Sequence, residues 1–127
     1  MQSFRELDVW QLAMRLAEST YRATSNMPKS EAYGLTSQIR RATVSVPANI
    51  AEGQGRNNLK EYLHFLGIAS GSNCELATLL QLTERVYPGL GFREEIETSN
   101  RVGMMLTKLK NSLRKSSANR PPTTDNR

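Results

Sequence analysis

The sequence is poor in the residue types that build most catalytic and metal sites. Among its 127 residues there is one histidine, His64, and one cysteine, Cys74. A single cysteine excludes an intrachain disulfide and is typical of a cytosolic protein. Glu61 and His64 have the Glu-x-x-His spacing of di-iron helix bundles, but such a site needs a second motif and two further glutamates. We therefore predict no metal site and no cofactor.

Signatures of catalysis and of membrane insertion are lacking as well. On one helix, His64 and Cys74 would lie roughly 15 Å apart along the axis, whereas a nucleophile and its base need hydrogen-bond reach. The sequence has no strand pattern, and it therefore has no glycine-rich phosphate loop that follows a strand. We predict that the protein is not an enzyme. The first residues, MQSFRELDVW, lack the apolar region of a signal peptide. No run of about 18 apolar residues is present to span a membrane, and we expect a cytoplasmic protein.

Short breaks rich in proline, glycine and asparagine divide the chain into segments with helical periodicity. The predicted helices cover about residues 7–24, 31–52, 59–86 and 92–116. Four helices with short connections and no strand pattern predict an all-α fold, an antiparallel up-down-up-down four-helix bundle. The bundle should form one domain, residues 1–116. Residues 117–127 contain two prolines and no large apolar residue, which predicts a disordered basic and polar tail.

The first predicted helix has an apolar stripe that should face the core. Its residues recur at i, i+4, i+7 and i+11, and they are Trp10, Met14, Ala17 and Tyr21. Val9, Ala13 and Leu16 widen the stripe.

The second predicted helix contains Pro47, which has no N–H for the carbonyl of Thr43 and whose ring crowds that carbonyl. The apolar residues nevertheless keep one phase on both sides of the proline. They are Leu35, Ile39, Ala42, Val46 and Ile50. A bent but continuous helix is therefore predicted. Ser30 should cap its start, and Gly53 to Gly55 should end it in left-handed geometry.

The third predicted helix, from Leu59 to about Val86, is unusually long and has apolar residues on several sides. They cover more than the stripe by which a surface helix faces one core. In so short a chain, another subunit is a reasonable partner for the additional apolar surface. Either Asn57 or Asn58 can cap its start.

A polar line of Ser45, Asn49 and Glu52, flanked by Arg41 and Arg56, follows one side of the second helix. If the next helix returns directly, Ser45 should lie near Gly67 and Arg41 near Gly71, so that the two glycines allow close packing. The same counting brings Glu75 close to Arg40 and Arg41. We interpret Ser45, Asn49, Glu52 and Glu75 as a structural polar seam with an ion pair. A ligand-binding line is the alternative.

The net charge of +5 is unevenly distributed. The segment from Arg101 to Lys115 contains five basic residues and no acidic one. The segment from Leu35 to Lys60 contains four basic residues and one acidic residue, Glu52. Such clusters favour polyanionic partners, above all nucleic acid, although basic residues near a helix C-terminus also complement its dipole.

Several separated motifs between about residues 4 and 113 resemble one protein family. They are Phe4–Leu7 with Val9–Trp10, Gln38–Ala42, Asn49–Gly53, Glu61–Leu66, Ile68–Ala69, Gly71–Ser72 and Glu75–Leu76. Together they resemble the four-helix-bundle proteins encoded in intervening sequences of bacterial 23S ribosomal RNA. The chain departs from the family pattern at Ala77, where a second glutamate is common.

The resemblance implies more than the residues themselves show. Proline at the position of Pro47 is common in the family, which implies a tolerated kink. The family is similar to the accessory proteins of diversity-generating retroelements, which form homopentameric barrels and bind nucleic acid and a reverse transcriptase. A ring-forming, non-catalytic protein is thus implied, with a homopentamer as the expected assembly.

Two functional hypotheses follow. In the first, a homo-oligomer binds nucleic acid, structured RNA in particular, through phosphate contacts. The contacting residues would be Arg40, Arg41, Arg56, Lys60, Lys108, Lys110, Arg114 and Lys115. Aromatic residues are few and several should be core, which disfavours stacking on single strands. In the second hypothesis, an oligomeric scaffold uses its third helix to bind a protein partner.

Overall fold

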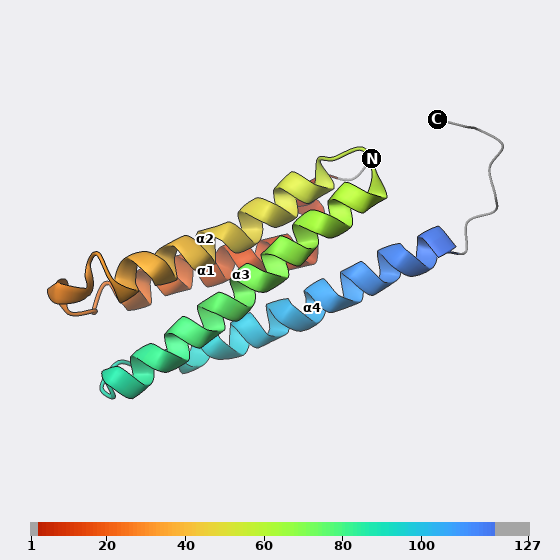
Figure 1. The fold of residues 1–127 in the computed structure, drawn as a ribbon. Coiled ribbons are helices and arrows are strands. Elements are labelled where there is room, and N and C mark those ends of the chain that lie inside the picture. The colour runs from red at the N-terminus through yellow and green to blue at the C-terminus, as the bar shows by residue number, and fades with distance from the viewer. Residues whose placement is uncertain (1–2, 119–127) are drawn as a thin grey trace.

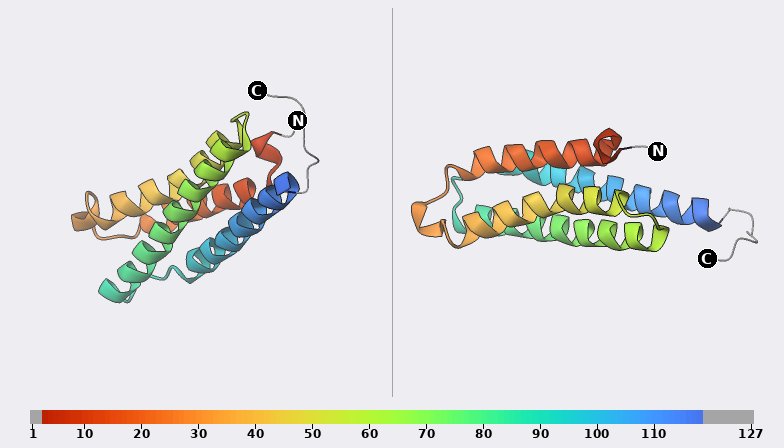
Figure 2. Two further views of the ribbon diagram at one scale, coloured as in Figure 1. Left: turned by 45° about the vertical axis from the view of Figure 1, so that its right-hand side comes forward. Right: turned by 90° about the horizontal axis from the view of Figure 1, so that it is seen from above.

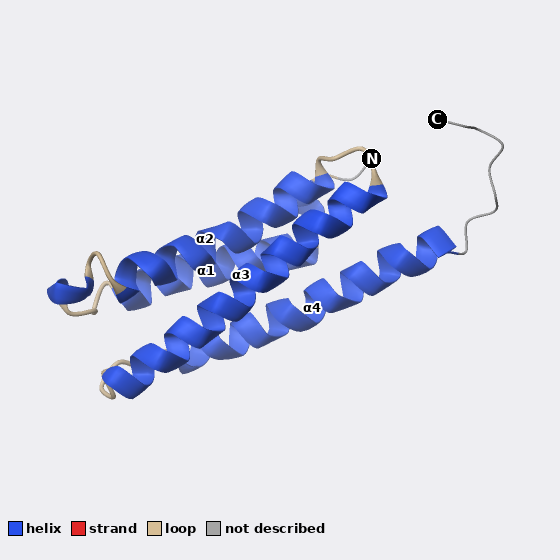
Figure 3. Ribbon diagram, in the orientation of Figure 1, coloured by secondary structure: helices blue, strands red, loops and turns tan. Residues whose placement is uncertain are grey.

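The computed structural model describes residues 3–118, and all regular secondary structure in this part of the chain is helical (Figures 1 and 3). The four long helices are α1 (Asp8–Thr24), α2 (Leu35–Gln54), α3 (Leu59–Val86) and α4 (Arg93–Ala118). Two short 3-10 helices, η1 (Phe4–Glu6) and η2 (Lys29–Glu31), precede α1 and α2. The predicted all-α class is confirmed. The predicted tail from residue 119 onward lies outside the described residues and stays a prediction.

Successive helices run in opposite directions (Figures 1 and 2). Each helix packs against its neighbours in the chain, and α1 also packs against α4, which closes the four-helix bundle. The start of α1, the α2–α3 turn and the end of α4 therefore lie at one end of the bundle. The α1–α2 connection and the α3–α4 turn lie at the other end (Figure 2).

The core face of α1 includes one edge of the predicted stripe and not the other. Val9, Ala13 and Leu16 are buried, as is Thr20, whereas Met14 and Tyr21 are 39% and 44% exposed. The face continues to Thr24, whose hydroxyl donates to the carbonyl oxygen of Thr20 at 2.8 Å. A threonine that returns its hydroxyl to the backbone can be buried at little cost. Packing thus turns the edge of the predicted stripe that contains Val9, Ala13 and Leu16 toward the core, and leaves the opposite edge exposed.

Helix α2 is continuous through Pro47, as the apolar phase predicted. Val46 and Ile50, on either side of the proline, are 1% and 0% exposed.

Both predicted ends of α2 are wrong in detail. Ser30 lies within η2 and caps nothing, while the carboxylate of Glu31 accepts a hydrogen bond from the N–H of Leu35 at 3.1 Å. Gly55 is right-handed, with φ −76° and ψ −10°. No glycine in residues 3–118 is left-handed.

Helix α3 begins where the sequence predicted. The side chain of Asn58 accepts a hydrogen bond from the N–H of Glu61 at 2.8 Å, which confirms it as the N-cap.

The register between α2 and α3 differs from the predicted one. Ser45 faces Ser72 across 2.8 Å between hydroxyl oxygens, whereas the counting placed it near Gly67. A helix turns a given face toward its neighbour only every third or fourth residue, so contacts shift in steps of about a turn. Gly67 and Gly71 are exposed, and a Cβ on either would meet no atom within 4 Å. The predicted close packing at these two glycines is therefore wrong.

The glycine that does allow close helix packing is Gly53 in α2. A Cβ at this position would lie 2.8 Å from the Cβ of Phe65 and 3.2 Å from Tyr62. Both neighbours belong to α3, so the close approach joins the two helices directly beside their turn.

Replacing Gly53 by alanine should lower the free energy of unfolding by about 1–2 kcal/mol. The overpacking costs about 1–3 kcal/mol, and the higher helix propensity of alanine offsets up to about 1 kcal/mol. Gly67→Ala is the matched control, because open space at that position leaves only the gain of about 0.5–1 kcal/mol. Urea unfolding midpoints with an unchanged m-value measure both. A Gly53→Ala variant as stable as the parent would contradict the close approach.

Candidate nucleic-acid interface

The eight basic residues predicted to contact phosphates separate into two groups. Five lie toward the end of the bundle where α4 finishes: Arg56, Lys60, Lys110, Arg114 and Lys115. Lys108 lies just past the middle of α4, where it lines a hollow with Cys74 and Ala77 of α3. Arg40 and Arg41 lie near the start of α2, toward the opposite end. A single continuous contact surface over all eight is therefore not formed within one chain.

The C-terminal half of α4 has the least compensated positive charge. Lys108, Arg114 and Lys115 are exposed, and no acidic residue occurs in the described chain after Glu97. Arg114 donates only to the side-chain oxygen of Asn111, at 3.5 Å. Lys110 is half-buried and donates to the hydroxyl of Ser70 at 2.9 Å. None of these four residues forms an ion pair within residues 3–118.

At the α2–α3 turn, the structure distinguishes Arg56 from Lys60. Arg56 lies 2.7 Å from the carboxylate of Glu52 and 3.5 Å from that of Glu61, and its guanidinium covers the ring of Phe65 at 4.9 Å. Its charge is thus compensated by two acids. Lys60 is exposed and has no ion-pair partner in the described chain.

In the second group, Arg40 is bound to α1, whereas Arg41 has no ion-pair partner within residues 3–118. Arg40 donates to the hydroxyl of Thr24 at 3.0 Å and to the carbonyl oxygen of Tyr21 at 3.2 Å, which ties α2 to α1. Arg41 is exposed. The predicted ion pair with Glu75 is wrong, since no ion pair joins Glu75 to either arginine within residues 3–118. Arg41 and Glu75 instead line one open hollow of about 420 Å³.

The structure brings together two of the four residues of the predicted polar seam. The side-chain nitrogen of Asn49 donates to the carbonyl oxygen of Ser45 at 2.8 Å and to its hydroxyl at 2.9 Å, and Ser45 in turn contacts Ser72. Glu52 pairs with Arg56 instead, and Glu75 is exposed. Ser72 is the member that sequence reasoning missed, because the predicted register placed Gly67 opposite Ser45.

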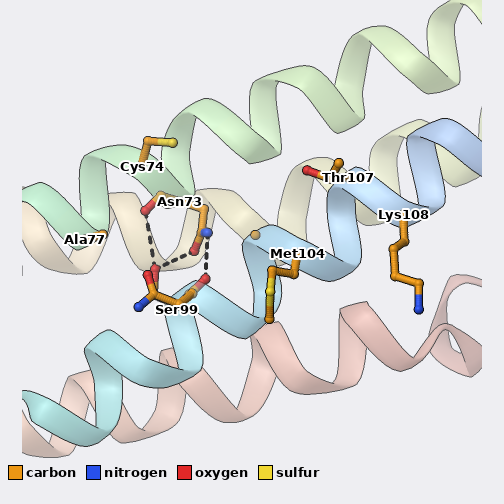
Figure 4. A pocket seen from close by; sticks show the side chains of 9 residues that line it. Asn73, Cys74, Ala77, Ser99, Met104, Thr107 and Lys108 are labelled. Atoms are coloured by element: carbon orange, nitrogen blue, oxygen red, sulfur yellow. Dashed lines mark hydrogen bonds between the residues drawn. The ribbon is translucent and has the colours of Figure 1, made fainter.

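A hollow of about 560 Å³ between α3 and α4 contains a second polar contact (Figure 4). The side-chain nitrogen of Asn73 donates to the carbonyl oxygen of Ser99 at 2.9 Å, and the hydroxyl of Ser99 donates to the side-chain oxygen of Asn73 at 2.9 Å. Both residues are buried. The pair satisfies these buried groups without a ligand, as stable buried polar groups require, and so it fixes α3 against α4.

One carboxylate near the start of α2 is held by two donors. The hydroxyl of Tyr87 donates to Glu31 at 2.5 Å, and the N–H of Leu35 donates to its other oxygen. The hydrogen bond from Tyr87, followed by that from Leu35, lowers the pKa of Glu31. The same bond, together with desolvation and the nearby negative charge, raises the pKa of Tyr87. Glu31 is thus ionised and occupied at neutral pH.

Side chains of the types that bind metals do not form a cluster in the described part of the chain. Within residues 3–118, no three histidine, cysteine, aspartate or glutamate side chains lie close enough to hold an ion. His64 is exposed, with its ring 5.4 Å from that of Phe65, and the thiol of Cys74 is exposed and unpaired. Of the helices described, none is long and apolar enough to cross a membrane.

Comparison with known proteins supports the resemblance found in the sequence. The model of the 23S rRNA-intervening sequence protein family matches residues 5–108. A crystal structure of a protein of unknown function from the S23 ribosomal protein family of Bacteroides thetaiotaomicron is similar in fold, with a TM-score of 0.59 and 21% identity. The alignment covers 85% of this chain and 96% of that chain. None of the curated proteins compared with the chain matches it.

Proposed function

We propose that this chain, which belongs to the 23S rRNA-intervening sequence protein family, binds structured RNA through exposed basic residues toward one end of the bundle. We call Lys60, Lys108, Lys110, Arg114 and Lys115 the basic end. The observation that carries the proposal is the uncompensated charge of α4, where no acidic residue follows Glu97 in the described chain. Contacts of such residues with phosphates fix the position of the nucleic acid and carry no information about base sequence.

The alternative explanation, that these residues serve the helix dipole, accounts for only part of the group. The dipole acts within about the last turn of a helix, and α4 ends at Ala118. Lys115 and Arg114 lie close to that end. Lys108 lies ten residues before it, nearly three turns away. A phosphate partner gives this lysine a role that the dipole does not.

A salt titration tests the proposal. The affinity for a labelled RNA duplex should fall steeply between about 50 and 200 mM salt, with close to one unit of slope in log affinity against log salt for each phosphate contact. A scrambled duplex of equal length should bind almost equally well. The absence of binding by the unaltered protein at about 50 mM salt would overturn the proposal.

We also propose that the chain forms a homo-oligomer, with five copies as the number implied by the family resemblance. A specific observation favours an interface on α3: Ile68, Leu82 and Val86 are large, apolar and exposed. Leu82 and Val86 follow Ile68 by 14 and 18 residues, which is close to four and five helical turns. The three side chains therefore share one face of α3. Exposed apolar faces of this kind mark protein interfaces. Binding of a different protein by this face is the competing function.

A further inference from the structure

An open surface between α1 and α2 carries two tyrosines and two arginines that the basic end does not include. Tyr21 is 44% exposed and Tyr33 is 101% exposed, so these two aromatic residues lie outside the core. Together with Arg40, Arg41 and Val44 they line a hollow of about 650 Å³. We call Tyr21, Tyr33, Arg40, Arg41 and Val44 the tyrosine–arginine surface. A hollow of this size falls in the range of small-ligand sites.

The members of this surface differ in how firmly they are held. The guanidinium of Arg40 lies 4.6 Å from the ring centroid of Tyr21, and its hydrogen bonds to Thr24 and Tyr21 fix it there. Tyr33 has neither a hydrogen bond nor a ring contact within residues 3–118. The ring of Tyr33 is thus free to stack on a ligand, beside an arginine pair that is partly fixed in place.

The positive charge of Arg41 is also available. The nearest carboxylate along the chain, that of Glu31, is occupied by Tyr87 and by the N–H of Leu35. Glu75 lines the adjoining hollow with Arg41, but no ion pair joins them in the described chain. An exposed tyrosine ring and an unpaired guanidinium therefore line one hollow.

We infer that the tyrosine–arginine surface binds one unpaired nucleotide of RNA, with its base stacked on Tyr33 and its phosphate bound by Arg41. The inference deepens the proposed function and rests on it. Sequence-tolerant stacking of bases on aromatic side chains is the usual way in which proteins hold unpaired nucleotides. Guanidinium groups match the geometry of phosphate oxygens. An acidic peptide would use Arg41 but would leave the exposed ring of Tyr33 without a matching partner.

The test compares three RNAs that share one short duplex. The first is blunt, the second has an unpaired 3′ overhang, and the third has the same overhang with abasic residues, which keeps the phosphates and removes the bases. The unaltered protein should bind the natural overhang about tenfold more tightly than the abasic one. Tyr33→Ala should abolish that difference and leave binding of the blunt duplex unchanged.

Two further variants separate stacking from charge. Tyr33→Phe should retain the preference for the natural overhang, because it keeps the ring. Arg41→Gln should weaken the binding of the natural and the abasic overhang to the same extent, because both overhangs contain the phosphates. Met104→Ala, which truncates an exposed apolar side chain on α4, is the matched control and should change nothing. Since Tyr33 is fully exposed and has neither a hydrogen bond nor a ring contact within residues 3–118, its variants should melt at the temperature of the parent.

The outcomes separate the inference from the function on which it rests. Binding of all three RNAs with equal affinity would overturn the inference and leave the basic end intact. Binding of the overhang without binding of the blunt duplex would instead overturn the basic end. If Arg41→Gln weakened the binding of a polyglutamate peptide and not that of the natural overhang, the surface would belong to a protein ligand and the inference would be wrong.

Discussion

Replacing Lys108, Lys110, Arg114 and Lys115 together by glutamine should lower the slope of log RNA affinity against log salt by about three to four units. Each lysine or arginine that contacts a phosphate releases close to one counterion. At about 50 mM salt, the loss of these contacts should weaken duplex binding by about a hundredfold or more. Fluorescence anisotropy of a labelled duplex at several salt concentrations measures both quantities.

The fold should survive this change, because three of the four side chains are exposed. Lys110 loses its hydrogen bond to Ser70, which is worth about 1 kcal/mol, and glutamine can also donate. The matched control is the quadruple change Arg22→Gln, Lys29→Gln, Arg85→Gln and Arg93→Gln. It removes the same charge from exposed positions at the opposite end of the bundle. Equal slopes for the two quadruple variants would show that net charge, and not the basic end, determines binding.

In solution, the protein should have a mass several times its 14.3 kDa chain mass. The triple variant Ile68→Gln, Leu82→Gln and Val86→Gln should sediment as a monomer at micromolar concentration. The three side chains are exposed in the single chain, so their replacement should leave the bundle folded. It removes the apolar area whose burial, at about 25 cal/mol per Å², drives association. Sedimentation velocity or light scattering measures the masses.

The matched control for this variant is the double change Met14→Gln and Val44→Gln. It replaces exposed apolar residues on α1 and α2 and should leave the assembly intact. An unaltered protein of 14.3 kDa would remove the homo-oligomer and favour a different protein as the partner of the α3 face.

The assembly and RNA binding should also be coupled. A ring repeats the basic end once in each subunit, and linked contacts raise the apparent affinity without any new contact. The monomeric triple variant should therefore bind a long RNA duplex more weakly than the parent, while the difference should shrink for a duplex that reaches one subunit only. Equal affinity of parent and triple variant for the long duplex would show that one chain suffices for binding.

Much of the fold follows from local sequence. The boundaries of α1 and α3 and the continuity of α2 through Pro47 were predicted, and the cap of α3 was narrowed to Asn57 or Asn58. Each depends on interactions within about one turn of helix: apolar periodicity, a side chain that reaches a nearby N–H, or a phase that a proline does not shift. The family motifs are likewise contiguous pieces of sequence.

Three features were decided only when the helices met one another. The face of α1 that enters the core includes Thr20 and Thr24, and the Thr24 hydroxyl donates to the backbone of its own helix. The α2–α3 register places Ser72, not Gly67, at Ser45, and makes Gly53 the site of close approach. Such contacts depend on how the side chains of different helices pack against one another, and local sequence patterns do not specify this packing.

The candidate sites show the same division. The sequence by itself determined where basic residues are concentrated, and that clustering is the basis of the proposed basic end. Only the tertiary structure decided which of them are available: Arg40 is bound to α1 and Arg56 to two carboxylates, whereas Arg41 and Lys108 are exposed. It also decided that Tyr33 lies outside the core. The charge of a residue is a property of its chemistry, but its partners are set by residues distant in the sequence that packing brings within hydrogen-bond reach.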